Sequence, residues 1–75
     1  MIMHISALRK TLDRRMPVDI TLWTRSGEVQ RWRNCVSLRH DFYAGTRLMK
    51  LLDSHQLRRV RDVCIFRCNN EEVYL

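Results

Sequence analysis

The chain has 75 residues, of which 45% are hydrophobic, and it carries 14 Lys and Arg against 8 Asp and Glu, a formal net charge of +6. This length predicts a single domain, residues 1–75, and the ordinary hydrophobic fraction excludes a disordered chain. Arginine supplies twelve of the fourteen basic residues, and its planar guanidinium pairs with phosphate in a bidentate geometry that lysine lacks. The charge therefore favours a nucleic acid as partner; a compositional excess of solvated arginines is the alternative.

The sequence carries no sign of export or of a membrane span. No stretch approaches the roughly 18 apolar residues that a spanning helix needs, and the N-terminal residues lack the apolar segment of a secretory signal. Three cysteines, an odd number, indicate reduced thiols. We therefore expect a cytoplasmic protein with no membrane contact. In so small a domain, the free energy gained by burying apolar surface nearly equals the entropy cost of ordering the chain. We therefore also expect a homo-oligomer, in which further surface is buried.

The first expected element is an amphipathic helix over about residues 3–15. Its apolar residues recur at spacings of three and four, and they are Ile5, Leu8, Leu12 and Met16. The opposite side is rich in Arg and Lys, which is typical of a helix with one buried face. Pro17 ends this helix, because the residue before a proline is driven toward extended geometry. We interpret the basic side as a solvated surface, with a phosphate-facing surface as the alternative.

Five strands are expected after the helix, over about residues 18–24, 28–38, 46–52, 57–68 and 71–75. The first two form a hairpin, because apolar side chains alternate along the first strand and Ser26-Gly27 provides the turn. The fourth strand is expected to be interrupted near Arg61-Asp62, and Asn69-Asn70 fits a tight turn, since Asn tolerates positive φ. Residues 39–45 are interpreted as a loop. The fold class is therefore α+β, with one helix before a strongly bent antiparallel sheet.

The second strand contains a change of alternation. Val29 faces one way, whereas Trp32, Val36 and Leu38 share the other face. A switch of this kind within one strand predicts a bulge or bend near Asn34-Cys35. Bends of this type turn the corners of small barrels, so a barrel is favoured over a flat sheet.

The sequence offers few residues that could act in catalysis or bind a metal. His40-Asp41 and His55 near Asp53 are the only acid–base neighbours, and no nucleophile can be placed beside either pair. Cys64 and Cys68 would lie about 13 Å apart on an extended strand, which is too far to share one zinc ion. We therefore expect no enzyme, no cofactor, no metal and no small-molecule substrate.

Arginines and aromatic residues form the remaining candidate site. Aromatic faces stack unpaired bases while arginines follow the phosphates, so this combination favours RNA or single-stranded DNA. Arg31 and Arg33 are expected to share one strand face, and Arg59 and Arg61 another. The predicted nucleic-acid-binding residues are Arg31, Arg33, Arg58, Arg59, Arg61, Tyr43 and Trp32. Trp23 and Phe42 lie close to this set, and we expect at least one of Trp23 and Trp32 to be in the core.

Residues 5–29 resemble the helix and first strand of the Sm-like fold of small RNA-binding proteins. The segment LRKTLDRRMPVDITLW, residues 8–23, is similar to that part of the bacterial Sm-like RNA chaperones. The resemblance implies a five-stranded, strongly bent SH3-type barrel that assembles into rings and binds RNA. Arg31, Asn34 and His40-Asp41 match the first motif of that family only loosely, and Leu57-Arg58-Arg59-Val60 matches the second only in its basic character. The C-terminal hairpin is also similar to that of short uncharacterised bacterial or phage-borne proteins, which implies no function.

Two functions from different classes remain open at this point. In the first, a small basic oligomeric barrel binds RNA or single-stranded DNA without catalysis. In the second, the protein is an interaction or assembly module whose C-terminal edge strand, residues 71–75, pairs with another copy or another protein. The arginine excess favours the first, and the resemblance adds nothing to that choice because SH3-type barrels host many functions.

Overall fold

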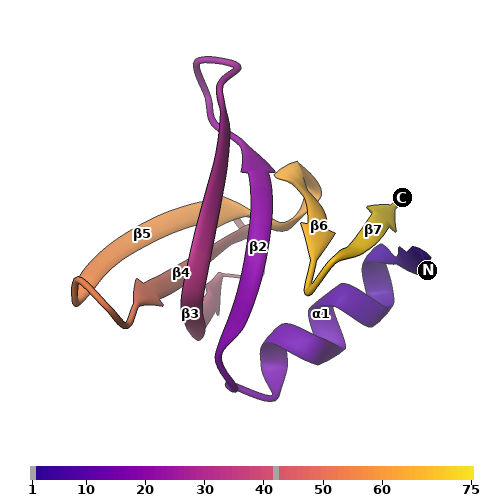
Figure 1. The fold of residues 1–75 in the computed structure, drawn as a ribbon. Coiled ribbons are helices and arrows are strands. Elements are labelled where there is room, and N and C mark those ends of the chain that lie inside the picture. The colour runs from indigo at the N-terminus through magenta and orange to yellow at the C-terminus, as the bar shows by residue number, and fades with distance from the viewer. Residues whose placement is uncertain (1, 42) are drawn as a thin grey trace.

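Nine elements follow one another in a computed structural model that describes residues 2–41 and 43–75. They are β1 (Ile2–His4), α1 (Ile5–Asp13), β2 (Val18–Trp23), β3 (Val29–Asp41), β4 (Thr46–Leu51), β5 (Gln56–Arg61), the 3₁₀ helix η1 (Asp62–Cys64), β6 (Ile65–Cys68) and β7 (Glu71–Tyr74). One helix and a sheet that dominates the chain make this a strand-rich α+β fold, as the alternation of apolar residues predicts (Figure 1).

The strands form one sheet in the order β1-β7-β6-β2-β3-β4-β5. Neighbours pair antiparallel except β1 and β7, which run parallel. The described residues therefore make seven strands where five were expected. One extra strand is the N-terminal β1, and the other arises because η1 divides the long strand expected over residues 57–68. The predicted interruption near Arg61-Asp62 is thus confirmed, and the sheet is open, with β1 and β5 at its edges.

The N-terminal helix is shorter than expected. Residues 2–4 are extended because they pair with residues 72–74 of β7, so the helix begins at Ile5. The side chain of His4 caps the helix by accepting a hydrogen bond from the backbone N–H of Ser6 at 3.2 Å. The helix ends at Asp13, before the expected boundary, and Met16 beyond it is 62% exposed and not part of the core.

The C-terminal strand lies inside the sheet. β7 pairs with β6 through Glu71 and Glu72 and with β1 through Glu72–Tyr74, so it lies between two strands. The expectation that residues 71–75 form an edge strand is therefore wrong, whereas assembly through these residues stays a prediction. The free edge next to the basic residues belongs to β5 instead.

Two bulges bend β3, which is longer than expected. Val18 pairs with Cys35 and Ile20 with Trp32, so β3 has one residue more than β2 there, and Asn34 takes a positive φ of 52°. The predicted bend near Asn34-Cys35 is confirmed. The face assignment beyond it is wrong, because the bulge turns Cys35 and not Val36 into the core.

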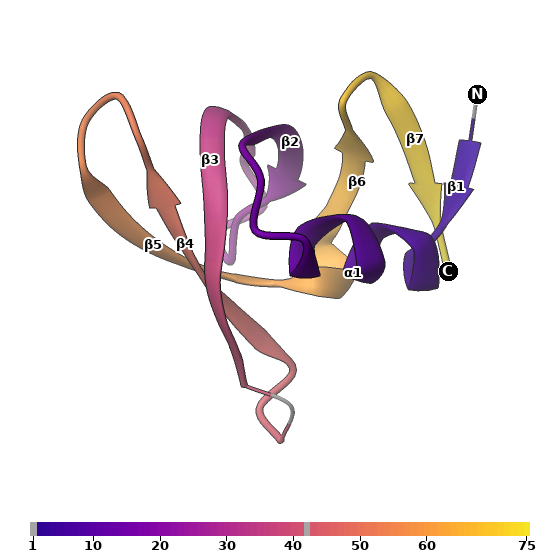
Figure 2. The same ribbon diagram turned by 90° about the horizontal axis from the view of Figure 1, so that it is seen from below.

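The second bulge in β3 lies between Ser37 and Arg39. Beyond it the strand continues to Asp41, paired with β4, so the loop expected over residues 39–45 is limited to the turn around Gly45. Leu38 is 39% exposed and does not face the core as expected, whereas Ser37 is buried. The bend lets β3 belong to two hairpins that extend in different directions from the sheet (Figures 1 and 2).

The core lies between α1 and the bent sheet, where α1 contacts β1, β3, β7 and η1 (Figure 2). The predicted apolar face of the helix supplies Ile5, Leu8 and Leu12. The strands add Val18, Ile20, Leu22, Trp32, Cys35, Met49, Val60, Ile65 and Cys68. Among the described residues, no helix has the length and apolar character needed to cross a membrane.

Candidate nucleic-acid interface

The edge strand β5 places two of its arginines on one face. Arg59 pairs with Leu48 of β4, and Arg61 pairs with Thr46. Val60 between them is buried on the opposite, core-facing side. Arg59 and Arg61 are both exposed, so the expectation that they share a strand face is confirmed.

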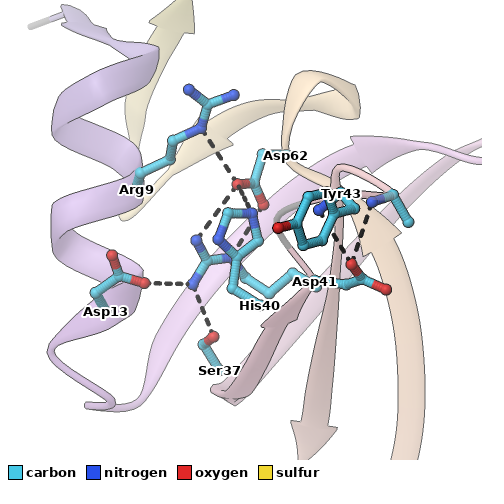
Figure 3. A network of polar contacts seen from close by, with 9 residues as sticks. Arg9, Asp13, Ser37, His40, Asp41, Tyr43 and Asp62 are labelled. Atoms are coloured by element: carbon cyan, nitrogen blue, oxygen red, sulfur yellow. Dashed lines mark hydrogen bonds and ion pairs between the residues drawn. The ribbon is translucent and has the colours of Figure 1, made fainter.

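A cleft of about 530 Å³, called here the Tyr43 cleft, lies beside Arg59. It is lined by Arg39, His40, Asp41, Tyr43, Thr46, Leu48 and Arg59. Tyr43 follows β3 in the turn and is 100% exposed. The Asp41 carboxylate accepts hydrogen bonds from the backbone N–H groups of Tyr43 and Ala44, each at 3.1 Å, and so holds the turn (Figure 3).

A second cleft of about 420 Å³, called here the Trp23 cleft, lies between the β2–β3 hairpin and β5. It is lined by Leu22, Trp23, Thr24, Arg25, Trp32, Thr46, Arg59, Val60, Arg61 and Cys64. Thr46 and Arg59 line both clefts, so the two clefts adjoin along these residues. The two clefts together are called here the groove, and each has one exposed aromatic residue in its lining, Tyr43 or Trp23.

The groove is lined by four guanidinium groups, those of Arg25, Arg39, Arg59 and Arg61. Its one carboxylate is that of Asp41. Of the fourteen Lys and Arg, all within the described ranges, those in ion pairs with carboxylates are Arg9, Arg47 and Arg67. None of the four groove arginines is neutralised within residues 2–41 and 43–75, so the groove has the charge expected of an anion site.

The structure brings together four of the seven predicted residues and separates three. Arg59, Arg61, Tyr43 and Trp32 line the groove. Arg31 and Arg33 are exposed on the other half of β3 and line neither cleft. Arg58 pairs with Met49, on the face opposite to that of Arg59, and donates a 2.6 Å hydrogen bond to Gln56.

The two tryptophans take different environments. Trp32 is 9% exposed, belongs to the core and donates its Nε1–H to Gln30 Oε1 at 3.0 Å. It therefore forms part of the wall of the cleft. The predicted stacking role requires an open ring face, and Trp32 has none. Trp23 is 49% exposed and contacts Phe66, with ring centroids 5.3 Å apart. The expectation that one of the two lies in the core is confirmed, and Phe42 lies outside the described residues.

The sequence analysis did not assign to the site one tryptophan and two arginines that line the groove: Trp23, Arg25 and Arg39. The alternation in β2 already places Trp23 opposite Ile20 and Leu22, so this signal was present in the sequence. Arg39 was assigned to a loop, and only its pairing with Leu48 puts it on the face of Arg59. Arg25 reaches the groove through the position of the hairpin relative to β5, which no local pattern encodes.

A second arginine environment lies next to the groove, in the core. Arg47 of β4 is 1% exposed. It donates to Asp62 of η1 through Nε at 2.9 Å and Nη2 at 3.3 Å, a bidentate ion pair (Figure 3). Its Nη1 donates to Asp13 of α1 at 2.8 Å and to Ser37 of β3 at 2.9 Å. A charge can be buried here because almost every donor of the guanidinium is paired.

The Asp62 carboxylate is shared by further groups. Arg9 Nε lies 3.3 Å from Asp62 Oδ2, and His40 Nε2 lies 3.4 Å from the same oxygen. Burial by itself lowers the pKa of Arg47, but the hydrogen bonds to Asp62 and Asp13 outweigh that penalty and hold the pKa above its ordinary value. No buried side-chain nitrogen or oxygen of the described residues lacks a hydrogen-bond partner.

This buried network lies next to the groove and shares His40 with it. It joins α1, β3, β4 and η1, which are distant in sequence. Asp62 follows Arg61 directly and opens η1, so its ion pair with Arg47 lies beside the end of β5. His40 contacts Asp62 and also lines the Tyr43 cleft. The core network and the surface groove therefore share elements but differ in charge: the network pairs Arg9 and Arg47 with Asp13 and Asp62, whereas arginines outnumber carboxylates in the groove.

The three cysteines are free thiols. Burial raises the pKa of Cys35 and that of Cys68 to about 11, whereas Cys64 is partly exposed and lines the Trp23 cleft. Across residues 2–41 and 43–75, no group of three or more His, Cys, Asp or Glu is arranged to hold a metal ion.

Neither a protein-family profile, nor a curated protein, nor a solved structure matches this chain. The resemblance to the Sm-like fold therefore stays a prediction. The geometry of the groove and the charge around it are the observations that bear on function.

Proposed function

We propose that the protein binds single-stranded nucleic acid, RNA or single-stranded DNA, along the groove formed by the Tyr43 and Trp23 clefts. The observation that carries this proposal is the set of four unneutralised guanidinium groups around two adjoining clefts, each with an exposed aromatic residue. Phosphates would be held by the arginines, and unpaired bases would stack on the aromatic rings. We propose that this binding is not catalytic.

The shared position of Arg59 supports a strand that crosses both clefts. Arg59 lines both cavities, so a phosphate bound at Arg59 would lie between two neighbouring nucleotides. Double-stranded nucleic acid stacks its bases internally and leaves no base for Tyr43 or Trp23. An unpaired strand can use both the charge and the aromatic faces.

We also propose that β2 to β6 form a small barrel of the SH3 or Sm-like type. In support, the last of these strands, β6, returns beside the first, β2, and β3 is bent twice. Rings or other homo-oligomers remain a prediction of the thin core, and sedimentation of the purified protein would measure their size.

The test compares two neighbouring arginines on one strand. A fluorescent single-stranded oligonucleotide of mixed sequence is titrated with the protein at several salt concentrations. Arg59→Gln should weaken binding and make the salt slope shallower by about 0.7, the contribution of one phosphate contact on a single strand. Arg58→Gln is the matched control, because Arg58 lies on the opposite face and lines neither cleft.

Two results would contradict the proposal. One is a wild-type protein that does not retain the oligonucleotide at low salt. The other is an equal loss for Arg58→Gln and Arg59→Gln, which would indicate diffuse attraction by the net charge of +6 instead of a groove.

A further inference from the structure

Trp23 is held at the end of β2 with part of its ring surface open. It pairs with Val29 across the hairpin, and the ring of Phe66 of β6 lies against it at an interplanar angle of 35°. The indole is nevertheless 49% exposed and lines the Trp23 cleft. A large aromatic side chain that is fixed on one side and exposed on another is a platform for a flat ring.

The rest of the cleft combines an apolar wall with positive charge. Leu22, Trp32 and Val60 are buried residues that contribute the wall. Three guanidinium groups surround it, and no carboxylate lines this cleft within the described residues. Its volume of about 420 Å³ lies in the range of small-ligand sites. The chemistry that fits is a flat aromatic ring that carries a phosphate.

We propose that the Trp23 cleft holds one unpaired nucleotide, with its base against Trp23 and its phosphate at Arg59 and Arg61. This inference rests on the proposed single-strand binding and adds a particular subsite to it. It assigns Trp23 as the residue that reads the presence of an unpaired base, whereas the arginines respond to charge alone. The same chemistry would accept the nucleotide from a strand or as a free nucleoside monophosphate.

A thiol in the cleft wall reports occupancy directly. Cys64 lines the Trp23 cleft and is partly exposed, while Cys35 and Cys68 are fully buried. At pH 8 a small alkylating reagent should therefore modify the native protein at Cys64 alone, as peptide mapping by mass spectrometry would establish. A nucleotide bound in the cleft would slow this reaction by covering the sulfur.

The experiment has two arms. In the first, Trp23→Ala should weaken oligonucleotide binding about tenfold, in the lower range for the loss of one base–aromatic stack, while Trp23→Phe stays within about threefold of wild type. In the second, the rate of Cys64 alkylation is measured with saturating oligonucleotide, with uridine monophosphate, and with inorganic phosphate. We expect at least threefold protection by the oligonucleotide and none by phosphate. Circular dichroism of each variant verifies that it is folded.

The outcomes separate this inference from the proposed function. If the oligonucleotide binds wild type and Trp23→Ala equally, or binds without protecting Cys64, the subsite is wrong and the groove proposal stands. If no oligonucleotide binds, the groove proposal fails, and protection by uridine monophosphate decides the subsite: protection supports a free nucleotide as ligand, and unchanged alkylation overturns it.

Discussion

Arg47 and Arg59 lie on neighbouring strands of one sheet and have opposite surroundings. Arg47 is 1% exposed and faces two carboxylates and a hydroxyl. Arg59 is exposed, borders two clefts and has no carboxylate partner among the described residues. A buried guanidinium is tolerated only when the fold supplies counter-charges, whereas an exposed one remains free for a ligand. The role of an arginine here therefore depends on the position of the nearest carboxylate and not on its residue type.

The counter-charges of Arg47 come from distant parts of the chain. Asp13 is 34 residues away and Asp62 is 15 residues away. The network is thus a product of tertiary structure and can form only when α1, β4 and η1 are in place together. The groove arginines are exposed to water and need no carboxylate partner in the fold. A bound anion would supply their counter-charge.

The largest effect on the free energy of unfolding is expected from a change of the buried arginine, Arg47. Arg47→Leu removes the bidentate partner of a buried carboxylate and should lower the free energy of unfolding by about 3 kcal/mol, because Asp62 is left undercompensated. Urea denaturation followed by circular dichroism measures the change. Arg9→Gln is the control: Arg9 contacts the same carboxylate but its side chain is 47% exposed, so we expect a cost of less than about 1 kcal/mol. Equal costs for the two variants would show that burial does not distinguish these arginines.

A smaller effect is expected from the buried thiols at alkaline pH. Burial raises the pKa of Cys35 and that of Cys68 from 9.0 to about 11. The unfolded chain therefore ionises these thiols first, and their contribution to stability is complete below pH 9 and is lost as the pH rises toward 11. The urea midpoint should fall over this window, and by less in a variant with both cysteines replaced by alanine. A midpoint that falls equally in that variant would assign the loss to other groups.

The smallest effect on stability is expected from the groove. The double variant Arg59→Gln and Arg61→Gln leaves no buried charge unpaired, so its free energy of unfolding should stay within about 0.5 kcal/mol of wild type. The same urea experiment measures it. A loss above about 1 kcal/mol would mean that these arginines support the fold, and the division between a structural and a ligand-binding set would have to be abandoned.

Local patterns were enough to predict the helix, the first hairpin and the bend in β3. The helix face of Ile5, Leu8 and Leu12, the hairpin at Ser26-Gly27 and the bend near Asn34-Cys35 all follow from spacing and turn chemistry. The parity of Arg59 and Arg61 follows from alternation alone. The conversion of residues 2–4 into a strand could not be predicted in this way, because it depends on the parallel pairing of β1 with β7.

The residues of the candidate site likewise fall into those that the sequence predicted and those that it missed. Tyr43, Arg59 and Arg61 were predicted because aromatic and basic residues are visible in any sequence. Arg39 was missed because its place in the groove depends on which strand lies beside which, whereas Trp23 was missed although the alternation in β2 already placed it on the face opposite to the core. The second bulge in β3 reverses the faces of the residues that follow it, and a bulge of this kind leaves no clear mark in the sequence.

By itself, the sequence determined the strand-rich character of this protein, its bent second strand and its excess of arginine. Those properties depend on side-chain alternation, backbone preferences and composition, which act over a few residues. Only the tertiary structure determined which arginines are neutralised and which line a groove. Charge pairing acts between side chains brought together by folding, so Arg47 and Arg59 acquire opposite roles only when α1, β4 and η1 have come together.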